Sequence, residues 1–338
     1  MKRAADALPV PAALGPTDRE LLEGVLAAQS RALAKAITLV ESTRADHQRR
    51  AHALLQALLP HAGGAIRIGV SGAPGVGKST FVEALGLHAI EAGHRIAVLA
   101  VDPSSALSGG SILGDKTRME QLARSPQAYI RPSPSAGTLG GVAGKTRETL
   151  LVCEAAGFDV IVVETVGVGQ SETAVAGMTD ALVLLQLPNA GDDLQAMKKG
   201  IVELADLIVI NKCDLDPQAA QRARSQFESV LPALQRRSTR WIPSVLVASA
   251  LTHQGIAEFW IEVGRFGEAM RAGGELEARR RAQAVSWMWE IIEHALRDRF
   301  GSSPEVQREL PALTAAVQDG SVAATVAAQH LLALAGIE

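Results

Sequence analysis

The stretch GAPGVGKST at residues 72–80 combines the residue types that can hold a phosphate group. It fits the pattern G-x-x-x-x-G-K-[ST] in full, between an apolar run and a helical one, as the pattern requires. Glycines let backbone N–H groups turn inward, and a helix start adds positive potential. The lysine can reach the β- and γ-phosphates. We therefore predict that a nucleoside phosphate is bound by Gly72, Ala73, Pro74, Gly75, Val76, Gly77, Lys78, Ser79 and Thr80.

A second motif, LIVINKCD at residues 207–214, concerns the base. Asn211, Lys212 and Asp214 have the form N-K-x-D after an apolar strand. A carboxylate can accept hydrogen bonds from the ring N1–H and the 2-amino group of guanine, and adenine has no donor at either place. A site built on such bonds discriminates strongly. The nucleotide is therefore expected to be GTP or GDP, with the backbone of Ser249, Ala250 and Leu251 packing on the other edge of the base.

Three acidic residues stand where a magnesium ion or the attacking water would be held. Asp102 ends the run RIAVLAVD, Asp115 lies in GGSILGDKTRM, and Glu164 stands where many GTPases carry the Asp of D-x-x-G. Carboxylates beside a triphosphate usually serve Mg²⁺ or its waters. The alternative for each is a cap on a turn or helix. The sequence predicts metal ligation by Ser79, Asp102, Asp115 and Glu164, and catalysis by Lys78, Asp102 and Glu164.

Two segments are candidate switches. Gly167 would let the chain pass close to the γ-phosphate in a switch II loop. In NAGDDLQAMKKGI at 189–201, Gln195 and Lys198 could reach a phosphate or a partner, and the alternative is an exposed, charged helix start. No residue copies the water-positioning glutamine of small GTPases, so we expect slow hydrolysis that a partner accelerates.

The elements that must position these residues are apolar runs separated by helical stretches. The runs AIRIGVSG, RIAVLAVD, VIVVET, ALVLLQ, LIVINK and SVLVAS are nearly continuous in β-formers, which is typical of strands buried on both faces of a parallel sheet. Their alternation with helices predicts an α/β fold with a doubly wound, mainly parallel sheet over residues 63–262.

The flanking regions, residues 1–62 and 263–338, are expected to be a helical extension and a helical arm. The extension should contain one helix in TDRELLEGVLAAQSRALAKAITLVES, opened by a capping box from Thr17 to Glu20, and a second helix in ADHQRRAHALLQALLP. In the arm, the run 279–281 of three arginines is interpreted as a solvated face, with an anion or partner site as the alternative. Trp287 and Trp289 lie on two sides of one helix, so either one is left for a partner subunit or both pack on the central domain.

Composition narrows the class of protein. The chain has 338 residues, of which 47% are hydrophobic and 20% are charged, and its net charge is −3. This small negative net charge provides no general attraction to nucleic acid, and no apolar run is long enough for a membrane span. The two cysteines lie in apolar segments, which favours a reduced, cytoplasmic protein.

Beyond these motifs, the stretches VDPSSALSGGSILGDKTRM, CEAAGFDVIVVETVGVGQSE, NKCD and RRRAQAVSWMWE resemble the MeaB family, also called ArgK. The family includes the human protein of cblA-type methylmalonic aciduria, and the resemblance covers about residues 20–300. It implies a SIMIBI-class P-loop GTPase that forms a homodimer through its C-terminal arm. It also implies a GTP-hydrolysing chaperone that gates cofactor loading into an adenosylcobalamin-dependent acyl-CoA mutase and protects that mutase from inactivation. Mg²⁺ would be bound directly, and adenosylcobalamin only through the mutase.

Two other functions compete with this one. A metallochaperone GTPase delivering nickel or cobalt would need a His/Cys cluster, and the eight histidines are scattered. A kinase of transport components would use ATP, whereas the N-K-x-D motif predicts binding of a guanine nucleotide.

Overall fold

The computed structural model describes residues 14–101, 119–131, 139–165, 171–188, 199–233 and 237–337. The chain divides into two compact units, a larger unit of residues Met1–Arg281 and a smaller unit of residues Ala282–Glu338. Asp102, Asp115, Gly167, Gln195 and Lys198 lie outside the described residues.

The larger unit is built on a seven-stranded sheet in which every strand pair is parallel. The strand order is β3-β2-β4-β1-β5-β6-β7. The strands are β1 (Ile66–Gly72), β2 (Ile96–Val101), β3 (Ala128–Arg131), β4 (Val160–Thr165), β5 (Ala181–Gln186), β6 (Leu207–Ile210) and β7 (Ser244–Val247). The predicted doubly wound α/β fold is confirmed.

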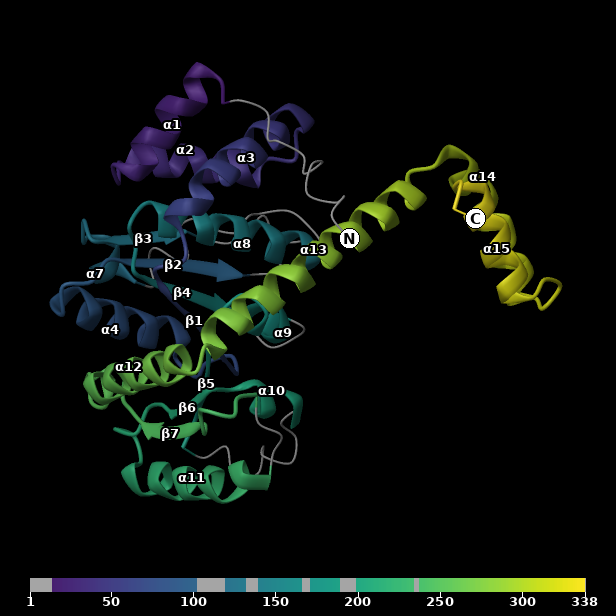
Figure 1. Cartoon of the computed structure of the whole chain (residues 1–338). Coiled ribbons are helices and arrows are strands. Elements are labelled where there is room, and N and C mark those ends of the chain that lie inside the picture. Colours follow the sequence, from purple (N-terminus) through teal and green to yellow (C-terminus); the bar gives the residue numbers. More distant parts are fainter. Residues whose placement is uncertain are drawn as a thin grey trace. The chain divides into compact units, whose positions relative to one another are not determined.

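Helices cover both faces of this sheet (Figure 1). Alternate residues of β4 face opposite sides of the sheet. Ile161 and Val163 pack with α8 and with two helices of the N-terminal extension, α2 (Ser30–Glu41) and α3 (Ala45–Leu58), whereas Val160 and Val162 pack with α4 and α12. A third apolar cluster joins β5, β6 and β7 to α10 and α11. The helices are α4 (Lys78–Glu91), α7 (Glu120–Ala123), α8 (Leu139–Ala155), α9 (Ser171–Ala176), α10 (Lys199–Leu204), α11 (Pro217–Val230) and α12 (Ile256–Ala272).

The N-terminal extension consists of α1 (Pro16–Leu26), α2 (Ser30–Glu41) and α3 (Ala45–Leu58). The predicted capping box is wrong, because α1 begins at Pro16 after Gly15 and no side chain caps it. Proline suits a first helical turn, where its missing N–H is no loss. The expected first helix is also broken, since Ala28 adopts a left-handed φ of 56° and the chain turns there into α2.

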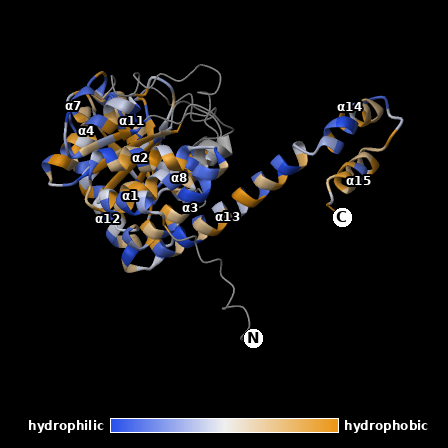
Figure 2. Ribbon diagram, turned by 90° about the horizontal axis from the view of Figure 1, so that it is seen from above, coloured by the Kyte–Doolittle hydropathy of each residue, from blue (hydrophilic) through white to orange (hydrophobic). Residues whose placement is uncertain are grey.

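Helix α13 (Glu275–Gly301) begins in the larger unit and ends in the smaller one. The smaller unit also contains α14 (Pro304–Gln318), capped by Ser303, and α15 (Ala324–Leu334). Several apolar side chains of α13 are exposed, namely Val285, Met288, Trp289, Ile291, Ile292 and Leu296. Figure 2 shows this mixed hydropathy along the helix. Among the described residues, no helix has the length and apolar character to cross a membrane.

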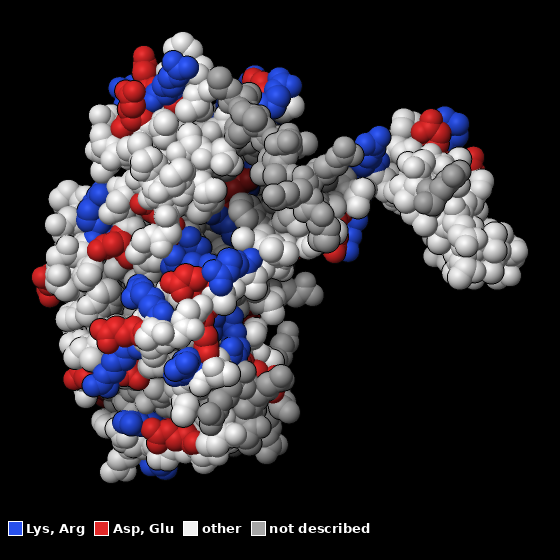
Figure 3. Space-filling model, viewed as in Figure 1, with Lys and Arg blue, Asp and Glu red and all other residues white. Residues whose placement is uncertain are grey.

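Charges of both signs are interspersed over the face of the larger unit in Figure 3. Neither sign gathers into a broad patch there, which agrees with the small net charge.

Candidate functional site

The phosphate-binding motif forms the turn between β1 and α4. Strand β1 ends at Gly72 and helix α4 begins at Lys78, so the helix start faces the turn. Gly77 has a φ of 94°, and a Cβ added there would lie 2.9 Å from the side-chain nitrogen of Asn211. Lys78 Nζ donates to the carbonyls of Gly72, at 2.9 Å, and Ala73, at 3.2 Å. The lysine is therefore held over the turn in which a phosphate would sit.

Glu164 lies beside this turn. It is the fifth residue of β4, which pairs with β1, the strand that leads into the motif. Its Oε1 accepts a hydrogen bond from Ser79 Oγ at 2.9 Å, and the residue is 6% exposed. The sheet thus brings together a carboxylate and a hydroxyl that are 85 residues apart in sequence.

This pair of oxygen donors fits a magnesium ion. Mg²⁺ takes carboxylate, hydroxyl and water oxygens, and in nucleotide sites it is held by few protein ligands. Ser79 and Glu164 supply two such groups next to Lys78. The other predicted ligands, Asp102 and Asp115, lie outside the described residues.

Asn211 ties the phosphate turn to the base-binding segment. Its Nδ2 donates to the carbonyl of Val76 at 2.8 Å, and its Oδ1 accepts from the backbone N–H of Ala250 at 3.1 Å. The residue is 1% exposed, so both bonds are buried. In the structure the Asn211 side chain joins two loops, and its predicted contact with the nucleotide stays a prediction.

Lys212 also leans on the phosphate turn. Its Nζ donates to the carbonyl of Gly75 at 2.8 Å, and its backbone has a left-handed φ of 62°. A non-glycine residue in this region is uncommon, and such strain concentrates at functional sites. The extended lysine stem offers an apolar surface beside the place predicted for the base.

The third segment, residues 249–251, is held by short-range bonds. Ser249 N–H donates to the carbonyl of Gln254 at 2.9 Å, and Ser249 Oγ accepts from Thr252 N–H at 3.2 Å. Leu251 is 75% exposed and Asp214 is also exposed. Both remain open to a ligand on the side of the site away from the core.

The variable residue of N-K-x-D, Cys213, faces the protein. Its backbone N–H donates to Ala248, and its thiol lies 3.7 Å from Gln254 Oε1. Burial, followed by the charge of Asp214, raises the pKa of the thiol. The thiol therefore stays protonated at neutral pH and has a packing role.

Sequence reasoning missed a buried polar pair beneath the site. Thr165 Oγ1 donates to Ser71 Oγ at 3.3 Å, and both residues are fully buried at the ends of β4 and β1. A hydroxyl residue near the end of each of two predicted strands was the available signal.

Comparison with known proteins shows which family the chain resembles. The family model described as methylmalonyl-CoA mutase-associated GTPase MeaB matches residues 33–305. A Caulobacter vibrioides protein named as a GTPase is 54% identical, over 95% of this chain and 98% of its own. The mouse mitochondrial methylmalonic aciduria type A homolog is 46% identical, over 92% of this chain and 78% of its own.

A crystal structure of a LAO/AO transport system kinase superposes with a TM-score of 0.77. It is 38% identical in sequence, and the match covers 95% of this chain and 98% of that one. The chain belongs to the MeaB family of methylmalonyl-CoA mutase-associated GTPases.

Proposed function

We propose that this GTPase is a chaperone of an adenosylcobalamin-dependent acyl-CoA mutase, with methylmalonyl-CoA mutase as its partner. It would gate cofactor loading by GTP hydrolysis and protect the mutase from inactivation. The hydrolytic part is supported above all by the contact of Ser79 with Glu164 beside Lys78. The partner is supported by the description of the family and by the name of the mouse relative.

In this proposal the phosphate turn binds and orients GTP. Lys78 and the start of α4 offset the charge that develops on the transferred phosphoryl group. Ser79 and Glu164 would hold Mg²⁺, which when bound neutralises charge on the β- and γ-phosphates. Asp214 accepts from guanine, and Lys212 and Leu251 flank the base.

The switch residues make the reaction dependent on a partner. Gly167, Gln195 and Lys198 are proposed to respond to the γ-phosphate and to contact the mutase, and Asp102 and Asp115 to complete the metal site. Because no residue copies the water-positioning glutamine of small GTPases, turnover would be slow until the mutase docks. Such coupling between a phosphate and loop structure is a common switching device.

The remaining parts of the proposal concern assembly. The arm of residues 263–338 would form a homodimer, for which the exposed apolar side chains of α13 offer a surface. The protein would act in the cytoplasm, without binding nucleic acid or membrane. Adenosylcobalamin would be met only on the mutase.

Nickel or cobalt delivery is the other function to test. It would need a cluster of metal-binding side chains, and the part of the chain that the structure describes holds no group of three His, Cys, Asp or Glu residues suited to a metal. No observation on the described residues favours it.

The deciding experiment measures GTP turnover of the full chain alone and with each cobalamin-dependent acyl-CoA mutase of the same genome. A rise of about tenfold or more with one mutase, absent from the Lys78→Ala variant, supports the proposal and names the partner. A rate that stays low with every mutase contradicts the chaperone proposal while leaving the GTP site in place.

A further inference from the structure

Two buried carboxylates lie at the amino ends of the strands, on the opposite side of the sheet from the nucleotide motifs. Asp180 directly precedes β5 and Asp206 directly precedes β6, whereas the nucleotide motifs follow the other ends of the strands. Asp180 is fully buried and Asp206 is 2% exposed. A buried carboxylate must be paired or hydrogen-bonded, so the groups around each aspartate indicate its structural role.

Each aspartate joins its strand to the neighbouring strand by hydrogen bonds. Asp180 Oδ2 accepts from the backbone N–H of Arg67 in β1 at 2.9 Å, and its own N–H donates to the Arg67 carbonyl at 2.8 Å. Asp206 forms the same pair of contacts with Leu182 in β5, at 2.9 and 2.8 Å. The two side chains therefore extend the ladders between β1, β5 and β6 by one step beyond the strands.

The opposing charges come from the first two turns of α13. Arg280 binds Asp180 through two nitrogens, at 2.7 and 2.6 Å. Arg279 binds Asp206, with contacts of 3.1 to 3.2 Å, and also donates to the carbonyl of Asp180. These arginine side chains are only 17% and 10% exposed, so the expected solvated face of residues 279–281 is wrong for two of the three residues.

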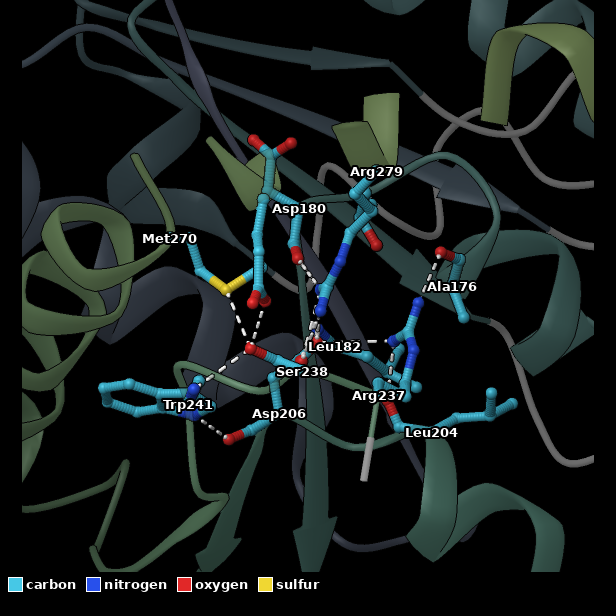
Figure 4. Close-up of polar contacts among 12 residues, drawn as sticks. Ala176, Asp180, Leu182, Leu204, Asp206, Arg237, Ser238, Trp241, Met270 and Arg279 are labelled. Atoms are coloured by element: carbon cyan, nitrogen blue, oxygen red, sulfur yellow. Dashed lines mark hydrogen bonds and ion pairs between the residues drawn. The ribbon is translucent and has the colours of Figure 1, made fainter. Parts of the chain in front are cut away.

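Arg237 completes the cluster. It lies 3.3 Å from Asp206 and donates to the carbonyls of Leu204, at 2.7 Å, and Ala176, at 3.4 Å (Figure 4). Burial lowers the pKa of Arg237, and the charge of Asp206 partly offsets that shift. The cluster thus reaches α9 and α10, the helices on either side of β5 in the chain.

The fastened strands are those that carry the nucleotide motifs. Strand β1 leads into the phosphate turn and β6 into Asn211, and the N–H of Asn211 donates to Gln186 at the end of β5 at 2.8 Å. When the amino end of a parallel strand shifts in register against its neighbour, the carboxyl end of that strand shifts as well. Loss of a countercharge at the aspartates would therefore disturb the bridge that Asn211 makes across the site.

We propose that Arg279 and Arg280 are positioning residues for the nucleotide site, acting through Asp206 and Asp180 on the register of β1, β5 and β6. The first two turns of α13, through Arg281, then serve the nucleotide site of the larger unit. This inference goes beyond the chaperone proposal and does not depend on it, because it concerns nucleotide binding by the chain alone.

The test compares Arg279→Gln and Arg280→Gln with Arg281→Gln in the full chain. Arg281 is the next residue of the same helix and is exposed, so it controls for charge and helix propensity. The readouts are the Kd for GDP, well below the unfolding temperature, and the ratio of Kd values for IDP and GDP. IDP lacks the 2-amino group, so the ratio reports on the placement of Asp214.

We expect both buried arginine variants to weaken GDP binding about fivefold or more and to lower the IDP/GDP ratio, because small misplacements of binding groups are costly. Arg281→Gln should stay within about twofold of the parent chain. If both variants melt earlier but keep the parent Kd and ratio, the ion pairs only stabilise the fold and the proposal is wrong.

A double variant that removes both charges of one ion pair keeps the proposal testable if a single arginine variant does not fold. Asp180→Asn combined with Arg280→Gln removes the buried charge together with its cationic partner, while the asparagine Oδ1 can still accept from the N–H of Arg67. Its Kd for GDP should return to within about threefold of the parent value. Binding as weak as in Arg280→Gln, or no folded protein, would overturn the proposal.

Discussion

Ser79 Oγ donates a hydrogen bond to Glu164 Oε1 across 2.9 Å, which joins the first turn of α4 to the end of β4. The two residues flank the place where the phosphate turn would hold the γ-phosphate. Carboxyl ends of neighbouring parallel strands are the usual location of ligand sites in such sheets. The contact brings a negative charge to the magnesium side of the site and not to its base side.

Glu164→Gln tests this charge. Glutamine keeps the length of the side chain and can still bond to Ser79, but it cannot neutralise a cation. We expect kcat for GTP hydrolysis to fall roughly 100-fold, the size of effect seen when one electrostatic stabiliser is removed, with GDP affinity within a few-fold. Single-turnover hydrolysis at several Mg²⁺ concentrations measures it. Glu91→Gln, on the exposed end of α4, is the matched control, and an unchanged kcat in Glu164→Gln would remove Glu164 from the catalytic set.

Asn211→Ala tests the bridge between two loops. The change leaves the Val76 carbonyl and the Ala250 N–H without their buried partner, and each such loss costs about 1–3 kcal/mol. We expect a lower unfolding temperature and GDP binding weakened about tenfold or more. Calorimetry and nucleotide titration measure the two effects. Cys213→Ala, in the same loop, should change neither by much, since the thiol has one long polar contact among the described residues, 3.7 Å to Gln254, and alanine keeps an apolar side chain at this buried position. Equal effects of the two substitutions would contradict a specific role for Asn211.

Asp214→Asn tests recognition of the base. Xanthine carries a carbonyl where guanine has its 2-amino group, so an asparagine amide can donate where the carboxylate could only accept. The variant should lose affinity for GDP and gain affinity for XDP, each by about 100-fold on the scale of hydrogen-bonded specificity sites. Competition titration gives both constants. Because Asp214 is exposed, the unfolding temperature should hardly move. A variant that still prefers GDP would place the base elsewhere.

Much of the fold follows from local sequence, because buried parallel strands are continuous apolar runs. Strands β4 and β5 coincide with the predicted runs VIVVET and ALVLLQ. The edge strand β3, Ala128–Arg131, was missed because only one of its four residues, Ile130, is buried. Short, partly exposed strands carry too few apolar residues to stand out.

Contacts between distant segments could not be read in the same way. The helical period places Arg279 and Arg280 on a helix surface but does not say what that surface meets, and here it meets two buried aspartates. The corresponding signal was a carboxylate directly before an apolar run, as at Asp180 and Asp206. Such residues are equally typical of exposed turns, so only tertiary structure distinguishes the cases.

Glu148 of α8 predicts how stability depends on pH. Burial raises the pKa of its carboxyl above the usual 4.5, although Lys145, 3.1 Å away, acts against the shift. The folded chain therefore keeps this proton to higher pH than the unfolded chain does. Between the two pKa values the folded state binds more protons, so the free energy of unfolding falls as pH rises through that window.

Glu148→Gln removes this titration and keeps the shape of the side chain. Relative to the parent chain, the variant should gain stability as pH rises above the usual carboxyl pKa of 4.5, and the gain should vanish at the acid end. Thermal unfolding of both chains across that range measures the difference, in which all other titrating groups cancel. Glu91→Gln, in which the exposed side chain is neutralised, should show no such trend. A difference between Glu148→Gln and the parent that is constant or shrinks with rising pH would show that Lys145 outweighs burial, since the ionised carboxylate would then stabilise the fold.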